Sequence, residues 1–232
     1  MTTSFSLNAT VFDYAQIRRN SYFESILAIC VNVYHTIINS TIKLDNDENT
    51  IRDAFLKYLQ SIEYKKKYKL KHLKFDKETA ENKGRADIRV LPTKNEYVDD
   101  EEYYLIECKR LDSKKLLSKY GLNAEYVKNG ICRFVSGYYS SHYGCGAMFG
   151  FLTESIDVQS DIISNINSML NMDFINDHNQ VVTAGVVKPL SYEDFANGYP
   201  YSFLSTHTHT SSKELILYHL MFDFSNIIMK MN

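Results

Sequence analysis

Hydrophobic residues near the start of the chain form one long apolar run, from Ile26 to Val33. Ser21 and Glu24 precede this run at the spacing of a capping box, in which two side chains satisfy backbone N–H groups of the first helical turn. We therefore expect a well-buried helix of about five turns that begins near Ser21.

A second helix is predicted after Asp45, where apolar residues return every three or four positions and give the helix one apolar face. The apolar residues are Ile51, Phe55, Leu59 and Ile62. Glu48 precedes Ile51 at the N-terminal end of the same stripe, so its carboxylate is expected to face inward. The alternative is a capping box of Asp45 and Glu48, since acidic residues favour the first turn of a helix.

Apolar and polar residues alternate strictly over residues 85–91, which is typical of a strand with two different faces. A second strand is predicted over residues 103–109. The connection between them contains turn residues and an acidic run at 99–102, so we expect the two strands to pair as a hairpin with a long loop.

The rest of the chain reads as alternating helices and strands, which favours an α/β fold. Helices are expected over residues 123–135 and 157–170. The uncharged residues 144–153 indicate a central strand that is buried on both faces. Residues 181–187 and 202–208 are further strands, and residues 215–224 suit either a strand or a buried helix; we take them as a strand.

Length and composition favour a single domain over residues 1–232, because 44% of the residues are hydrophobic and no Gly/Ser/Pro-rich linker divides the chain. The N-terminus lacks the pattern of a signal peptide, and the apolar run at 26–33 is too short to span a bilayer. Four cysteines show no zinc-ligand spacing. We therefore expect a cytoplasmic protein with reduced thiols and no membrane contact.

The formal net charge of −2 does not attract nucleic acid to the molecule as a whole. A local exception is the lysine-rich stretch 64–77, where Lys66 and Lys67 are flanked by tyrosines. These lysines could follow a phosphate backbone while the tyrosines stack on bases. The alternative is an ordinary solvated edge, as most charged runs are.

The candidate chemistry lies on the two strands of the predicted hairpin. Glu107 and Lys109 project from the same face of one strand, about 7 Å apart, and Asp87 joins them if the strands pair. Charges leave water only when they are paired, hydrogen-bonded or bound to a cation, and residues 104–106 are apolar. A metal site explains the arrangement, and a cross-strand ion network on a solvated face is the alternative.

Three histidines lie near the C-terminus of the chain. His207 and His209 share one face of a strand, and without a third ligand nearby we expect them in a loop or an edge strand. His219 lies inside an apolar run, where a histidine with satisfied hydrogen bonds is expected in the core. We therefore predict no metal site at these histidines.

The pattern Gly84-Arg85-Ala86-Asp87 with Glu107-Cys108-Lys109, a preceding helix and a following helix resembles the PD-(D/E)XK nuclease superfamily. The resemblance covers about residues 45–137, and Ala86 stands where the family name has proline. It implies a restriction-endonuclease-like core, in which a central mixed β-sheet is flanked by helices. It also implies hydrolysis of phosphodiester bonds with a divalent metal ion.

The resemblance implies a role for each residue at the site. Asp87 and Glu107 would be ligands of Mg²⁺ or Mn²⁺, and Lys109 would orient the attacking water or stabilise the charge of the transition state. Glu48 would be an accessory ligand or hydrogen-bonding partner. On the helix that follows, Lys128 and Arg133 would reach a phosphate near the metal, or else pair with surface carboxylates.

These features predict a metal-dependent DNA endonuclease, of restriction, defence or mobile-element type. Its partner is DNA, and a homodimer would supply the two active sites that cutting both strands often requires; a subunit that needs another chain for target recognition is a further alternative. The alternative is a catalytically inactive module that binds nucleic acid or protein on the same fold.

Overall fold

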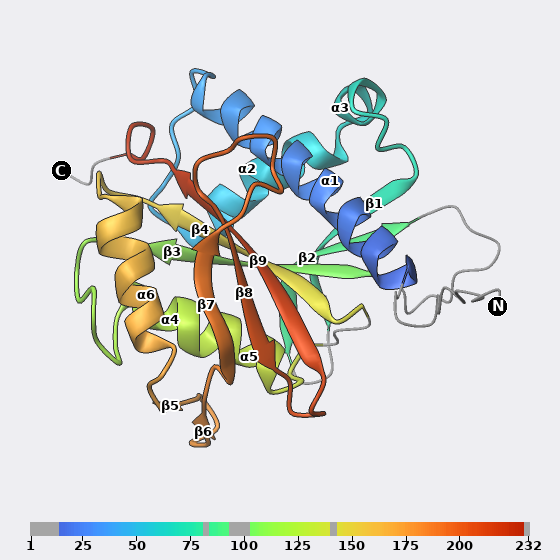
Figure 1. The fold of residues 1–232 in the computed structure, drawn as a ribbon. Helices are drawn as coiled ribbons and strands as arrows, with labels where there is room; N and C mark the ends of the chain where they lie inside the picture. The colour runs from blue at the N-terminus through green and yellow to red at the C-terminus, as the bar shows by residue number, and fades with distance from the viewer. Residues whose placement is uncertain (1–13, 81–83, 93–102, 140–142, 230–232) are drawn as a thin grey trace, which may run out of the picture.

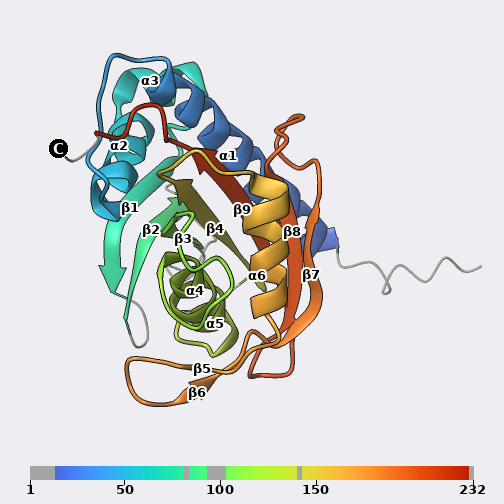
Figure 2. The same ribbon diagram turned by 90° about the vertical axis from the view of Figure 1, so that its left-hand side faces the viewer.

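A computed structural model describes residues 14–80, 84–92, 103–139 and 143–229. In these residues a seven-stranded mixed sheet has the strand order β1-β2-β3-β4-β9-β8-β7, and helices cover both of its faces (Figures 1 and 2). The predicted α/β fold with a mixed sheet flanked by helices is confirmed at this level. The acidic run 99–102 lies outside the described residues.

The sheet combines antiparallel edges with a parallel centre. The strands are β1 (Leu73–Ala80), β2 (Arg85–Pro92), β3 (Tyr104–Leu111), β4 (Cys145–Leu152), β7 (Val186–Tyr192), β8 (Ser202–Thr208) and β9 (Glu214–Asp223). β3, β4 and β9 are parallel, while β1, β2, β7 and β8 join by antiparallel pairing. β5 (Phe174–Ile175) and β6 (Val181–Val182) form a separate short ladder.

Two groups of helices cover the sheet, one on each face (Figure 2). One group is α1 (Tyr14–Ile38), α2 (Glu48–Gln60) and α3 (Ile62–Lys67). The other group is α4 (Leu122–Tyr126), the π-helical turn η2 (Val127–Ile131), α5 (Cys132–Val135), the π-helical turn η3 (Val158–Ile163) and α6 (Ser164–Met169). Because β4 lies between both layers, all its residues are buried, as the uncharged run predicts.

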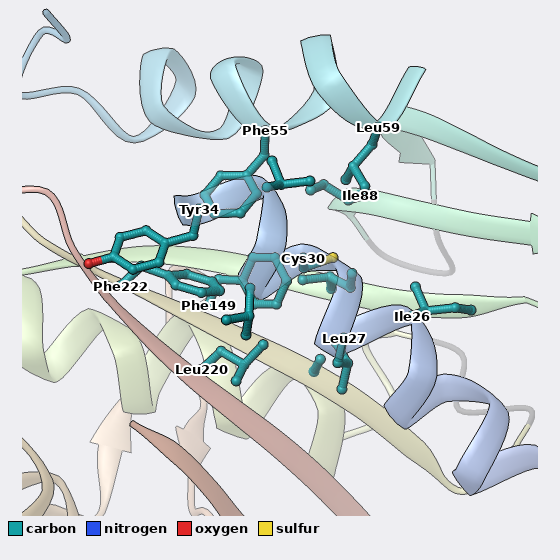
Figure 3. Packing of buried hydrophobic residues seen from close by; sticks show 14 of the residues in the cluster. Ile26, Leu27, Cys30, Tyr34, Phe55, Leu59, Ile88, Phe149, Leu220 and Phe222 are labelled. Atoms are coloured by element: carbon teal, nitrogen blue, oxygen red, sulfur yellow. The ribbon is translucent and has the colours of Figure 1, made fainter. Parts of the chain in front are cut away.

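Aromatic packing holds α2 on the sheet (Figure 3). The ring of Phe55 on α2 lies 5.6 Å from that of Phe149 on β4 and 5.1 Å from that of Phe222 on β9. Burying one such ring stabilises the fold by about 1.5–3 kcal/mol. This packing fixes the start of α2 beside the end of β3, where the candidate site lies.

The predicted start of the first helix is wrong. α1 already includes Tyr14, so Ser21 and Glu24 lie inside the helix, and the Glu24 carboxylate accepts a hydrogen bond from Tyr218 (3.0 Å) instead of capping. Among the described residues, only α1 is long and apolar enough to cross a membrane, and half of its most apolar window is buried.

The second helix and the region after it also differ in detail. The cap of α2 is Asp47, which accepts from the Thr50 N–H, so the capping box of Asp45 and Glu48 that was the alternative for Glu48 does not form. The helix breaks at Ser61, and Ile62 is 72% exposed instead of continuing the apolar face. β1 was not predicted, and the strand expected at 181–187 is divided between β6 and β7.

A chain of hydrogen bonds joins buried polar groups on the layer that contains α4. Tyr126 Oη lies 2.8 Å from His219 Nδ1, and Ser205 Oγ lies 2.7 Å from both His219 Nε2 and His207 Nε2. His207 Nδ1 lies 2.7 Å from the Ala184 carbonyl, which can only accept, and burial lowers the pKa of both rings; with neutral rings the direction of every hydrogen bond in the chain is fixed. His219 is the satisfied core histidine predicted, whereas His207 lies on an inner strand and not at an edge.

Both rings are expected to stay neutral in acid. Burial lowers the pKa of His207 to about 4 and also holds the pKa of His219 well below its ordinary value, against about 6.5 in an unfolded chain. At pH values between the folded and the unfolded pKa, the unfolded chain binds more protons than the folded protein. His207 therefore removes about 2 kcal/mol of stability when the pH falls from 7.5 to 5, and His219 acts in the same direction.

Nitrogen-detected NMR at pH 5 tests this prediction through the tautomers. The folded protein should show His207 with its proton on Nδ1 and His219 with its proton on Nε2, whereas both rings should titrate near 6.5 in urea. Titration of either ring near 6.5 in the folded protein would show that the hydrogen-bond chain does not hold it neutral.

Candidate functional site

The candidate site forms where β2 and β3 separate. Their antiparallel pairing ends at Ile88 and Ile106, one residue before Asp87 and Glu107 would face each other. Beyond this point the Asp87 carboxylate, in place of a backbone carbonyl of β2, accepts the hydrogen bond of the Cys108 N–H (2.8 Å). A backbone N–H of β3 therefore fixes the Asp87 carboxylate at the site. The predicted approach of Asp87 to Glu107 and Lys109 is observed.

The ammonium group of Lys109 lies at the centre of the site. Its Nζ donates to Glu107 Oε1 (2.7 Å), Glu48 Oε1 (3.2 Å) and the Cys108 carbonyl (2.7 Å), which uses all three hydrogens. Asp87 Oδ2 lies 3.9 Å away. Three carboxylates from α2, β2 and β3 thus surround one cation, and the pKa of Lys109 is raised because their charges outweigh the desolvation that opposes it.

Glu107 is the most deeply buried carboxylate of the site, with a side chain 2% exposed. Its Oε2 accepts from Tyr139 Oη at 2.9 Å, and Arg133 Nη1 lies 3.6 Å from its Oε1. Burial raises the pKa of Glu107 to about 7, while the charge of Lys109 opposes this rise. Glu107 therefore changes charge near neutral pH.

The start of α2 contributes Glu48 to the site. Its Oε1 accepts from Lys109, and its Oε2 accepts from the Arg110 N–H at 3.1 Å. Arg110 in turn donates to the Asn46 carbonyl at 2.5 Å, which ties the end of β3 to the turn before α2. The expectation that Glu48 faces inward is confirmed by these contacts.

Arg52 and Tyr139 belong to the site but were not predicted. Arg52 is 1% exposed and donates to Asp87 Oδ1 at 3.0 Å. Its signal in the sequence is its position one turn after Glu48 and three residues before Phe55, on the inward face of the helix. Tyr139 had no comparable signal, because it follows the turn after α5 rather than a periodic element.

The ring of Tyr138 lies against Gly84 at the start of the motif. A Cβ at this position would collide with the ring of Tyr138. The guanidinium of Arg133 lies over the ring of Tyr138 in a cation–π contact, with its Cζ 5.1 Å from the ring centroid. The glycine therefore lets the chain enter β2 directly beneath Tyr138, next to Asp87.

The predicted nucleic-acid-binding residues lie in two places. Arg133 and Lys128 line one cleft next to Tyr138, and Lys128 pairs with Glu125 at 2.6 Å, the alternative expected for it. Lys66 and Lys67 lie on α3, which contacts the start of β1 through Lys65. That end of the sheet lies roughly 15 Å along the strand from Asp87, so these two lysines are not brought to the site.

Within the described ranges, no three side chains of His, Cys, Asp or Glu are grouped closely enough to hold a metal ion as they stand. At Asp87, Glu107 and Glu48 the ammonium of Lys109 takes the central position. Comparisons of the chain with protein-family models, curated proteins and solved structures found no match. The likeness to PD-(D/E)XK nucleases thus remains a hypothesis based on these residues.

Removing the central ammonium is expected to destabilise the fold strongly. Lys109→Met leaves Glu107 buried beside two other carboxylates, at a cost of about 3–5 kcal/mol. The pKa of Glu107 then rises further, so the folded protein binds more protons than the unfolded chain, and the loss is larger at pH 8 than at pH 6.

Urea unfolding at both pH values measures this loss of stability, with Lys128→Met as the matched control. Lys128 makes an ion pair with a partly exposed carboxylate, so its removal should cost no more than about 1 kcal/mol at either pH. Equal losses in the two variants would show that Lys109 does not hold the cluster together.

Proposed function

We propose that the protein is a divalent-metal-dependent nuclease that hydrolyses phosphodiester bonds in DNA, built on a restriction-endonuclease-like core. The observation that carries the proposal is the convergence of Glu48, Asp87 and Glu107 on the ammonium of Lys109. Such a cluster of mostly buried charges is costly to form, and structures retain such costs chiefly where the charges have a use.

The donor atoms of the site suit Mg²⁺ or Mn²⁺. Asp87, Glu107 and the Cys108 carbonyl offer hard oxygen atoms, and Mg²⁺ is usually held by one or two carboxylates with water and substrate phosphate. When bound, the metal would acidify a water molecule and neutralise charge on the phosphate. Lys109 would donate to the same phosphate oxygens, and Glu48 would orient that ammonium.

The substrate would reach the site past the cleft at Tyr138. Arg133 lies between this cleft and Glu107, with its side chain 25% exposed, so it can meet a phosphate next to the reacting one. Lys128 lines the same cleft. A homodimer or a recognition subunit would supply the further contacts that target selection requires.

Cleavage of supercoiled plasmid with Mg²⁺, with and without EDTA, tests the proposal. Asp87→Asn and Glu107→Gln should lower the rate by at least about 10²–10³-fold, because each removes a charged group from the reacting centre. The exposed Asp173→Asn is the matched control and should cleave like the wild type. Mg²⁺-dependent cleavage that survives both site substitutions would rule the proposal out.

The pH dependence of cleavage should report Glu107. Because its pKa is about 7 and only the carboxylate binds a metal, the rate should fall as the pH drops below 7. Metal and proton compete for this group, so raising the Mg²⁺ concentration should move the acid limb to lower pH. A limb that does not respond to Mg²⁺ would show that Glu107 is not a ligand.

A second function, as a catalytically inactive nucleic-acid-binding module, is favoured by one observation. Arg52, Lys109 and Arg133 already compensate the charges of Asp87 and Glu107 without a metal. Such a module would bind DNA with a salt-dependent affinity and show no turnover with Mg²⁺ or Mn²⁺. Binding that is lost in Arg133→Gln but unaffected by EDTA would support it over the nuclease.

A further inference from the structure

Glu78 is a strained residue inside β1, directly across from Asp87. Its neighbours Lys77 and Thr79 pair with Ile88 and Ala86, the residues on either side of Asp87. Its φ of 47° lies in the left-handed region, which is unusual for a side chain other than glycine or asparagine and is costly within a strand. Strain of this kind persists only where surrounding contacts impose it, and it gathers at functional sites.

Two guanidinium groups hold the Glu78 carboxylate: the exposed Arg85, whose Nη1 lies 3.1 Å from Glu78 Oε2, and the buried Arg52. Arg52 Nη2 donates to Glu78 Oε1 at 3.2 Å, and Arg52 Nη1 donates to Asp87 Oδ1 at 3.0 Å. Asp53 accepts two further hydrogen bonds from Arg52, at 3.1 and 3.2 Å. Glu78 and Asp53 thus fix the guanidinium of Arg52, which also donates to Asp87.

The fixed guanidinium of Arg52 helps to set the orientation of the Asp87 carboxylate. Its Oδ1 is held by Arg52 and its Oδ2 by the Cys108 N–H, so the plane of the carboxylate is set from both ends. Groups that hydrogen-bond to a ligating carboxylate typically change metal affinity 10–100-fold when they are removed.

We propose that Glu78 and Arg52 form a positioning pair that orients Asp87 for a divalent cation. The pair is not catalytic, since it acts only through Asp87. This inference rests on the proposed function, because it assumes that Asp87 is a metal ligand. It extends that function by giving the strained strand β1 a role at the site.

Mn²⁺ binding by electron paramagnetic resonance, measured together with the melting temperature, tests the pair. Glu78→Ala and Glu78→Gly both remove one of the two carboxylates that fix the Arg52 guanidinium beside Asp87, while Asp53 stays bonded to it, so each should weaken Mn²⁺ binding about tenfold. Only glycine also relieves the left-handed backbone, so Glu78→Gly should melt about 2–4 °C above Glu78→Ala. Glu78→Gln keeps an oxygen acceptor for Arg52 and should retain most of the affinity.

Lys69 provides the matched control, because it is an exposed residue with a φ of 57° on the turn after α3. Lys69→Gly should melt above Lys69→Ala by a similar amount, and neither should change Mn²⁺ binding. If the wild type binds Mn²⁺ and both small variants at position 78 bind it equally well, the positioning role is wrong. A loss of Mn²⁺ affinity in Glu78→Gln as large as in Glu78→Ala would also overturn it, since the negative charge of Glu78, and not its hydrogen bond to Arg52, would then determine the affinity. A wild type that binds no Mn²⁺ removes the proposed function and this inference together.

Discussion

The ammonium of Lys109 is the interaction on which the candidate site depends. It uses its three hydrogens on Glu107, Glu48 and the Cys108 carbonyl, and only 9% of its side chain is exposed. Without it, a carboxylate that is 2% exposed would lie beside two others with no cation among them. Such a group either finds a cation or loses its charge, so the ionised site requires a positive charge at this position.

The fold supplies this position through two separate constraints. Separation of β2 from β3 frees the Cys108 N–H, which then holds Asp87. Packing of Phe55 against β4 and β9 fixes α2 so that Glu48 meets the end of β3. Neither constraint is local in the chain, because the residues they join lie on α2 and on the four strands β2, β3, β4 and β9.

The elements that the sequence predicted well are those with a strong period. Alternation identified β2, and continuous apolarity identified β4. β1 was missed because its lysines resemble a solvated edge and because Lys77 stands where the alternation begun by Leu73 and Phe75 would place an apolar residue. In the site, the relation of Glu107 to Lys109 follows from strand geometry alone, whereas Tyr139 enters through tertiary packing that no local pattern encodes.

The most direct test of the central claim is a crystal structure of the protein grown with Mn²⁺, examined by anomalous scattering. If the cluster is a metal site, an anomalous peak should lie between the carboxylates of Asp87 and Glu107, with the ammonium of Lys109 moved from its bond to Glu107. A map that shows no peak there, with Lys109 still bonded to Glu107 and Glu48, would contradict the account.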